Sequence, residues 1–471
     1  MDVCLLSTPL QPTSYNDIQN EYVDAFYKIR LSNFKKIKAL DFTKLPDIVI
    51  QDIPLLTLAG FLKRTSNHGI LYFDLSTVPL TEIPPVKVYA FGSFSCNYHI
   101  ALETARSLKQ KYPQSRFIIG GPHATYMDGS ILKDDVFDIV VRGEGESIFK
   151  NILDHLNGKK DISDIRGITC MKDGKIVRNP DDELKLRSVP IPDYSFLKNG
   201  SQLPTAIIFT SRGCPYKCSF CVNANMKNRV VYKRDQDIMD ELERLYSTFG
   251  SRLFYVGDET FTLNEERALR IMNIFESFKE DAYWIFQTRI DRLTKKILAK
   301  LKTCKKLIEI DVGIENIDDS VLKLNQKNLT FSQICTGLQK LKKTGKKVLG
   351  YWIVGLPGET QETLKKNLHF MKYFLANGFL YLIEVGCFVP YPGTDIYRNP
   401  ERYGITIHSR NFSGYTGESF PSYSTAGLSA ERIFAWYLRV LQEIAGIYRM
   451  TYQREAPEVQ VQTEKFDKGL F

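Results

Sequence analysis

The sequence lacks the long apolar segments and the leader pattern of a membrane or secreted protein. No stretch approaches the ~18 consecutive apolar residues of a membrane span. The apolar run at residues 1–8 is too short, and has no basic start, for a signal peptide. Internal repeats and low-complexity segments are also absent. We therefore expect a cytoplasmic protein, in which cysteines act more often as metal ligands or catalysts than in disulfides.

The sequence also lacks an RNA-binding signature and any dense basic run, although its net charge is +9. The positive charge is typical of a solvated lysine-rich surface, and an acidic partner such as an acidic peptide is the alternative. We expect no nucleic-acid partner. The 471 residues are 43% hydrophobic and 12% aromatic, which indicates a folded chain with several domains.

The first part of the chain is expected to be an open α/β domain with a parallel sheet, because short apolar strands alternate with helices. Two strands end in the glycine turns Gly120-Gly121-Pro122-His123 and Gly143-Glu144-Gly145-Glu146, where such sheets bind ligands. We expect strands at 48–52, 86–91, 116–119 and 138–141, and helices at 54–63, 98–111 and 147–156.

The middle of the chain is expected to be a partial (β/α) barrel with six units, followed by a helical extension. Between the two domains, Asp173-Gly174 predicts a small hairpin of 168–172 and 175–177 within a linker. The expected boundaries are 1–160 for the first domain, 161–203 for the linker, 204–400 for the barrel and 401–471 for the extension. The barrel strands are expected at 206–210, 253–256, 283–287, 307–312, 347–354 and 380–385.

The segment after the first barrel strand carries the most specific motif. Cys214, Cys218 and Cys221 form a CxxxCxxC pattern within eight residues. Zinc sites normally use four Cys or His ligands in paired units, and no second pair is present. A [4Fe–4S] cluster normally takes four thiolates, so three would leave one iron open to a substrate or cofactor.

With an aromatic residue before the last cysteine, this motif resembles that of the radical S-adenosylmethionine (SAM) superfamily. The resemblance implies that SAM binds the open iron and is reductively cleaved to a 5′-deoxyadenosyl radical, with electrons from a flavodoxin- or ferredoxin-type donor. Further segments match the family's strand-end motifs in order, from Val256–Phe261 to Pro390–Thr394. The cofactor-binding residues that this resemblance implies are Asp258, Glu259, Gln287, Arg289, Glu315 and Gly355.

The glycine turns of the first domain resemble those of the subgroup with an N-terminal cobalamin-binding domain. The DxHxxG signature that provides a cobalt ligand is absent, and His99 and His123 are the only nearby imidazoles. The domain is therefore expected either to bind cobalamin without this ligand or to serve as a structural or peptide-docking domain.

Cys387 is the candidate catalytic residue, because it follows the sixth expected strand at the mouth of the barrel. A thiol there could return a hydrogen atom to a substrate radical, as in radical SAM peptide epimerases; the alternative is a small buried core residue. The favoured function is L-to-D epimerisation of a ribosomally made precursor peptide, resembling the proteusin enzymes. A cobalamin-dependent C-methyltransferase is the main alternative, and a dehydratase acting on a natural-product sugar is a third.

Overall fold

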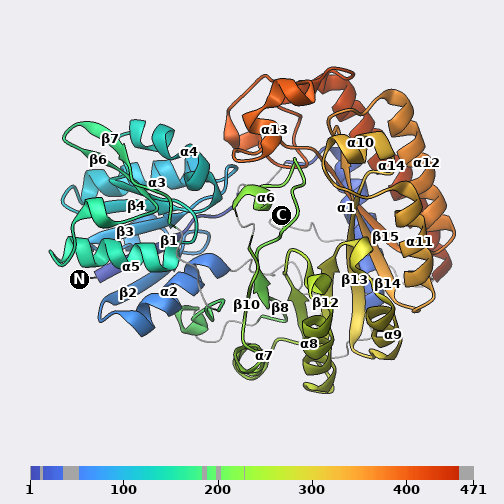
Figure 1. Cartoon of the computed structure of the whole chain (residues 1–471), viewed down its shortest axis with the longest axis horizontal. Helices are drawn as coiled ribbons and strands as arrows, with labels where there is room; N and C mark the ends of the chain where they lie inside the picture. Colours follow the sequence, from blue (N-terminus) through green and yellow to red (C-terminus); the bar gives the residue numbers. More distant parts are fainter. Residues whose placement is uncertain are drawn as a thin grey trace.

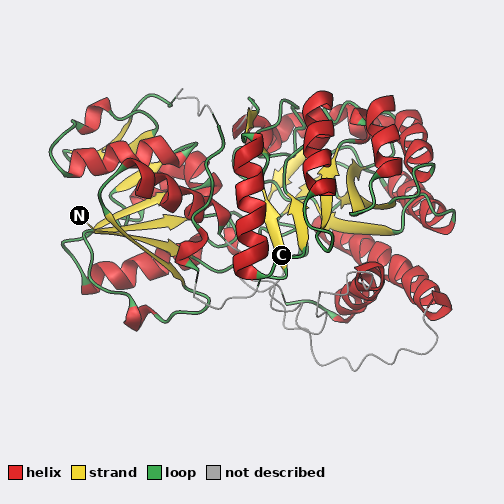
Figure 2. Cartoon of the chain, turned by 90° about the horizontal axis from the view of Figure 1, so that it is seen from below, coloured by secondary structure: helices red, strands yellow, loops and turns green. Residues whose placement is uncertain are grey.

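The computed structural model describes residues 2–10, 14–34, 52–182, 188–197, 203–226 and 229–455. The chain forms two α/β units that lie side by side, with a C-terminal extension packed on the second unit (Figure 1). Both units have a sheet flanked by helices (Figure 2). In the described ranges no helix is long and apolar enough to cross a membrane.

The first unit has a seven-stranded sheet in the order β2-β1-β3-β4-β5-β6-β7. The first five strands in this order are parallel, and β6 and β7 form an antiparallel edge. The strands are β1 (Asp2–Ser7), β2 (Gly69–Asp74), β3 (Val88–Gly92), β4 (Arg116–Gly120), β5 (Ile139–Val141), β6 (Ile168–Lys172) and β7 (Lys175–Arg178).

Helices cover both faces of this sheet because successive strand residues point to opposite sides. In β1, Val3 and Leu5 pack in one apolar cluster, and Cys4 and Leu6 pack in another. The first cluster includes residues of α2 (Ile53–Thr65) and α5 (Gly145–Leu156). The second includes residues of α3 (Tyr98–Lys111) and α4 (Pro122–Lys133). Each large side chain buried in this way stabilises the fold by about 1.5–3 kcal/mol.

The expected hairpin forms, but it is not a linker. Its turn residues Asp173 and Gly174 have φ of 51° and 72°, as a two-residue hairpin turn requires. β6 pairs with β5, so the hairpin extends the first sheet and this part of 161–203 belongs to the first unit. The strand expected at 48–52 lies outside the described residues except for Asp52, whose side chain caps α2.

The second unit is the expected six-stranded partial barrel, with all strands parallel in the order β8-β11-β12-β13-β14-β15. The strands are β8 (Thr205–Ile208), β11 (Leu253–Val256), β12 (Tyr283–Thr288), β13 (Leu307–Glu315), β14 (Lys347–Val354) and β15 (Leu382–Cys387). The outer helices are α7 (Asp235–Phe249), α8 (Glu265–Ser277), α9 (Lys295–Thr303), α10 (Asp319–Leu324), α11 (Phe331–Lys342) and α12 (Gln361–Ala376). Short elements accompany the cysteine loop: β9 (Ser211–Arg212), α6 (Asn223–Met226) and β10 (Val231–Tyr232).

Helix α1 (Asp17–Phe34), which the sequence did not predict, lies within the segment expected for the first domain but packs on the barrel. In Figure 1 it lies beside β13–β15, away from the rest of the N-terminal unit. The Tyr22 hydroxyl donates to the Ile383 carbonyl oxygen at 2.6 Å, and Arg30 pairs with Glu309 of β13 at 2.6 Å. This placement corrects the expected boundary of 1–160, because the segment that contributes β1 also contributes a helix to the barrel.

The extension contributes a long helix, α14 (Ala430–Glu455), that packs beside α1 and β15. It is preceded by α13 (Asp395–Arg398) and by a small hairpin of β16 (Ile405–Ile407) and β17 (Tyr423–Thr425). The Tyr448 hydroxyl accepts from the Ile383 amide and lies 2.9 Å from its carbonyl oxygen. The two helices α1 and α14 therefore close the side of the barrel beyond β15.

Candidate functional site

The cysteine loop follows β8 and is anchored at its start by Asp258, which is fully buried. The backbone amides of Thr210 and Ser211 donate to Oδ1 of Asp258 at 2.6 and 2.9 Å. Both hydroxyls donate to Oδ2 at 2.6 Å. Since its oxygens already accept four hydrogen bonds, Asp258 positions the loop and is not exposed to a cofactor, which revises the cofactor-binding role expected for it.

We expect Asp258→Asn to destabilise the protein by about 2–4 kcal/mol, because the neutral amide replaces a charged acceptor and the Thr210 and Ser211 hydroxyls must turn from donating to accepting. The iron content after reconstitution should fall in parallel. Urea unfolding and iron analysis measure both effects. The control is Asp240→Asn, at an exposed acceptor on α7, which should change stability by less than about 0.5 kcal/mol. Equal stability of the two variants would contradict the anchoring role.

The three thiols of the loop lie in an environment that carries positive charge. Cys218 is 8% exposed, and the Arg289 guanidinium lies 3.8 Å from its sulfur. Burial raises the pKa of the Cys218 thiol, while the Lys327 and Arg289 cations lower it. Burial raises the pKa of Cys221 to about 11, and the neighbouring Cys218 raises it further. Deprotonation to thiolates therefore needs a positive charge in addition to these side chains.

The donor set fits an iron–sulfur cluster. In the described part of the chain, no group of three or more His, Cys, Asp or Glu side chains forms a ready-made metal site, so the thiols share a loop without converging on one point. Thiols converge when a metal replaces their protons, because binding and deprotonation are coupled. Cys214, Cys218 and Cys221 would hold a [4Fe–4S] cluster, with Arg289 beside it.

Arg289, one of the residues expected to bind the cofactor, contacts this loop, and Glu315 is linked to Arg289 through Lys327. The Arg289 guanidinium lies over the Tyr216 ring and donates to the Lys327 carbonyl oxygen at 2.8 Å. The Lys327 ammonium pairs with Glu315 at 2.9 Å. Glu315 has a φ of 65° at an irregularity in the β13–β14 pairing, which turns its side chain toward Lys327. Lys327 belongs to no motif, so sequence reasoning missed it.

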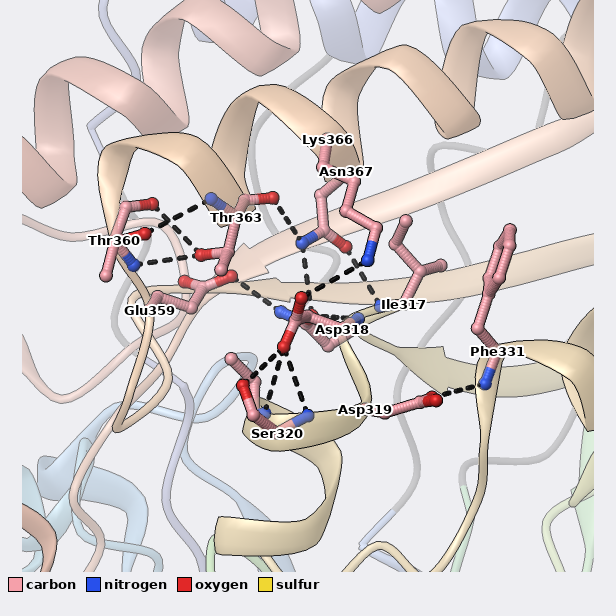
Figure 3. A network of polar contacts seen from close by, with 12 residues as sticks. Ile317, Asp318, Asp319, Ser320, Phe331, Glu359, Thr360, Thr363, Lys366 and Asn367 are labelled. Atoms are coloured by element: carbon pink, nitrogen blue, oxygen red, sulfur yellow. Dashed lines mark hydrogen bonds and ion pairs between the residues drawn. The ribbon is translucent and has the colours of Figure 1, made fainter.

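The turn after β14 is held by a buried carboxyl group, Glu359. It accepts hydrogen bonds from the Gly355 amide at 2.6 Å and from the Asn316 side chain at 2.6 Å. Figure 3 shows Glu359 within the network that joins the start of α12 to the turn after β13. Burial raises the pKa of Glu359 to about 8, although these hydrogen bonds lower it. Gly355 has a φ of 87°, and its carbonyl oxygen accepts from Tyr423, so its role here is structural.

A cavity of about 340 Å³ lies between the first unit and the barrel. On the first unit it is lined by the carboxyl ends of β3, β4 and β5 and by their glycine turns. On the barrel it is lined by residues of the cysteine loop region and the acidic turn: Phe209, Arg212, Asn223 and Glu259. Glu259 also accepts from the Gly213 amide at 3.1 Å. The cavity therefore reaches from the first sheet to the cysteine loop.

The two sides of this cavity are joined by ion pairs. Arg212, two residues before Cys214, pairs with Glu146 at 2.8 Å and lies 3.6 Å from Glu144. These carboxylates belong to the glycine turn after β5. The glycines of this turn therefore line the cavity, and its two glutamate carboxylates hold the cysteine loop against the first unit.

The lining of this cavity fits a large apolar cofactor with a polar tail. Its walls include Ala90, Ile118, Val141 and Phe149, and Gly143 has open space where a Cβ would stand. No histidine is among its described lining residues. His123 is instead buried against Ser95 at 3.0 Å, and burial lowers its pKa to about 4. Cobalamin would be held here by backbone and apolar contacts.

Tyr126 of α4 is a further residue that sequence reasoning missed. Its hydroxyl is buried and has no hydrogen-bond partner. Its ring packs over Gly393, where a Cβ would collide with it. Burial raises the pKa of the Tyr126 hydroxyl, and the charge of Cys221 adds to this effect. No sequence signal marks it, because its position depends on the packing of the two units.

Cys387 does not face the lumen of the barrel. It is 5% exposed and packs in the apolar core, where burial raises the pKa of its thiol well above the usual value. Its neighbours in β15, Glu384 and Gly386, line a second cavity inside the barrel. Gln287 and Glu315 line the same cavity, and the Tyr255 hydroxyl donates to Gln287 at 3.3 Å. The structure favours the core alternative for Cys387.

Two family models match these two units. The radical SAM superfamily model matches residues 208–371, and the B12-binding domain model matches residues 85–153. The chain contains a radical SAM domain preceded by a B12-binding domain. The radical SAM domain implies a [4Fe–4S] cluster, SAM and an electron donor, and the B12-binding domain fits cobalamin as a further cofactor.

Two curated proteins and a solved structure match most of this chain. An uncharacterized methyltransferase of Pyrococcus horikoshii is 27% identical over 87% of this chain and 90% of its own. An anaerobic magnesium-protoporphyrin IX monomethyl ester cyclase of Rubrivivax gelatinosus is 26% identical over 84% of this chain and 75% of its own. The solved structure of the radical SAM methyltransferase TsrM from Kitasatospora setae, with cobalamin and a [4Fe–4S] cluster bound, has a TM-score of 0.61 at 16% identity. It covers 86% of this chain and 78% of the other, and it shows that the fold is shared.

Proposed function

We propose that this protein is a cobalamin-dependent radical SAM methyltransferase. The observation that carries the proposal is the cavity between the two domains. Its lining combines the glycine turns of the B12-binding domain with Arg212, next to the cysteine loop, and Glu259 of the acidic turn after β11. Methyl transfer to a radical substrate needs the methyl carrier and the radical source at one site. The named methyltransferases among the similar proteins support this choice.

The groups that the chain would bind supply the difficult chemistry: the reduced cluster cleaves SAM, and cobalamin carries a methyl group. The chain's own residues position these groups. Arg289 and Lys327 place positive charge beside the Cys218 thiol. Arg212 joins the cysteine loop to Glu144 and Glu146 of the B12-binding domain. The ion pairs fix the spacing between the two cofactor sites.

The expected peptide epimerase finds no support. Such an enzyme needs a hydrogen donor at the substrate, and the candidate Cys387 is 5% exposed and is not among the residues that line the cavity of the lumen. The similar proteins are methyltransferases and a cyclase.

The test is the fate of SAM in anaerobic protein reconstituted with iron, sulfide and cobalamin. Transfer of a methyl group leaves S-adenosylhomocysteine, whereas reductive cleavage leaves 5′-deoxyadenosine and methionine. With a chemical reductant, we expect both nucleosides by mass spectrometry, and S-adenosylhomocysteine only when cobalamin is loaded. Formation of 5′-deoxyadenosine alone, with cobalamin bound, would reject the methyltransferase.

A Cys387→Ala variant separates the two functions further. We expect it to retain both SAM-derived products, since the thiol does not reach the lumen. Its stability should fall by about 1–2 kcal/mol, the cost of a small cavity in an apolar core. A variant that folds and cleaves SAM but has lost all product formation on its substrate would return Cys387 to a catalytic role.

A further inference from the structure

The lumen of the barrel holds a cavity of about 360 Å³, whose larger set of lining residues includes Gln287 and Glu315. It lies between β14, β15 and the two helices α1 and α14 that close the barrel beyond β15. Its walls are largely aromatic, with Tyr22, Phe26, Tyr351 and Tyr437 among them. Three carboxyl groups also line it: Glu315, Glu384 and Glu418.

The positive charges near this cavity are already taken. Lys327 pairs with Glu315 at 2.9 Å, and Arg30 pairs with Glu309, below the cavity on β13, at 2.6 Å. Within the described residues, Glu384 and Glu418 have no ion-pair partner. Two acidic groups thus face this space, and Arg30, the cation whose charge acts on Glu384, is already paired with Glu309.

This arrangement is costly for the empty protein. Burial raises the pKa of Glu384 to about 7; Arg30 lowers it, while Glu418 and Glu309 raise it. Burial also raises the pKa of Glu418. A buried carboxylate is stabilised when a cation with hydrogen-bond donors reaches it, because the ion pair replaces lost hydration. Aromatic walls suit such a ligand, since rings attract cations and pack on apolar groups.

Adjoining hollows that share lining residues mark a polar route from the cavity toward the surface. Gln19 and Glu418 also line a second hollow of about 320 Å³, whose other walls include Ser14, Asn16 and Ser419. That hollow shares Ser413, Gly414 and Phe420 with a surface groove beside the β16–β17 hairpin. Between the two inner hollows, the Gln19 side chain donates to the Glu418 carbonyl oxygen at 2.7 Å. One side-chain rotation there would widen this route.

We propose that the substrate enters by this route and places a cationic nitrogen, an amine or guanidinium, against Glu384 and Glu418. The rest of the substrate packs on the aromatic walls, within the lumen next to Glu315 and Gln287. The assignment of this ligand as the substrate rests on the proposed function. The nitrogen belongs either to a small amine or to a Lys or Arg side chain of a peptide, and the two sources share this chemistry.

The test is binding of defined probes to the full-length protein loaded with cluster and cobalamin. Tyramine represents a small aromatic amine, tyrosol is its neutral alcohol counterpart, and Nα-acetyl-lysine N-methylamide represents a peptide side chain. Equilibrium dialysis should show tyramine or the lysine derivative binding roughly tenfold tighter than tyrosol. Tighter binding of tyramine identifies a small-molecule site, and tighter binding of the lysine derivative identifies a peptide.

Variants locate the site. Glu384→Gln and Glu418→Gln should each remove the preference for the cation, because an amide keeps the shape and loses the charge. The matched control is Glu443→Gln. Glu443 of α14 forms an exposed ion pair with Lys372 of α12, and this variant should keep the preference for the cation. Glu384 lies on a core strand, so if Glu384→Gln fails to fold, Glu418→Gln in the loop decides the result.

Two results would overturn this inference and leave the proposed function standing. One is equal binding of amine and alcohol by protein whose cluster and cobalamin spectra are intact. The other is displacement of the amine by SAM, which would assign these carboxyl groups to the sulfonium cofactor. Conversely, a preference for the amine in protein that forms no S-adenosylhomocysteine would reject the methyltransferase and retain the cation site.

Discussion

Replacing Cys218 with alanine is expected to abolish the iron–sulfur absorbance and SAM cleavage together. Cys218 is the most buried of the three thiols, and Arg289 lies 3.8 Å from its sulfur. Two remaining thiolates cannot hold a cluster that already lacks a fourth protein ligand. We expect SAM cleavage to fall by at least about a hundredfold, because losing even a hydrogen-bond partner of a metal ligand typically costs about 10–100-fold. Visible absorbance and 5′-deoxyadenosine formation under anaerobic conditions measure the two effects.

The matched control is Cys335→Ala. Cys335 is a half-buried thiol on α11, outside the cysteine loop. This variant should keep both the absorbance and the cleavage. If Cys218→Ala folds and still forms 5′-deoxyadenosine, the assignment of the cluster to this loop is wrong.

Filling the cavity of the B12-binding domain is expected to remove cobalamin without affecting the cluster. Gly120 ends β4 and lines this cavity, and a Cβ there would meet only Val141, at 3.6 Å, which is ordinary contact. Gly120→Leu therefore fits the backbone and places an isobutyl group in the cavity. We expect cobalamin affinity to fall at least about tenfold, since overfilling a packed site costs about 1–3 kcal/mol.

Gly129→Leu is the control within the same domain, because Gly129 on α4 has nothing within 4 Å of its Cβ position and does not line the cavity. It should bind cobalamin like the unaltered protein. Spectrophotometric titration with hydroxocobalamin gives the affinities. Equal affinities for the two variants would place the corrinoid elsewhere or exclude it.

The architecture of the barrel could be predicted from the sequence because local and global signals agree there. Each strand is a short apolar run followed by an amphipathic helix, and β11 and β14 have the boundaries that the pattern predicted. Helix α1 was missed because its buried face includes Gln19, Tyr22 and Arg30, which pack against polar groups of the barrel. A helix that covers a polar lumen carries no clear apolar stripe.

The site could be predicted only in part, for a different reason. Arg289, Glu259 and Glu315 lie close to the cysteine loop as their motifs implied. The orientation of Cys387 could not be predicted, because neighbouring strand residues point to opposite faces and a shift of one residue exchanges them. Gly386 faces the lumen, and Cys387 faces the core. Lys327 and Tyr126 could not be predicted, because each contacts residues distant in the sequence that only folding brings near it.

The most direct test of this account is the metal content of one anaerobically reconstituted sample. We expect the iron and sulfide of a single cubane cluster together with one cobalt per chain, with the cluster lost in Cys218→Ala and the cobalt lost in Gly120→Leu. Retention of both metals in both variants would contradict the account that a methyl carrier and a radical source bind on either side of one cavity. A protein that takes up iron but never cobalt would contradict it as well.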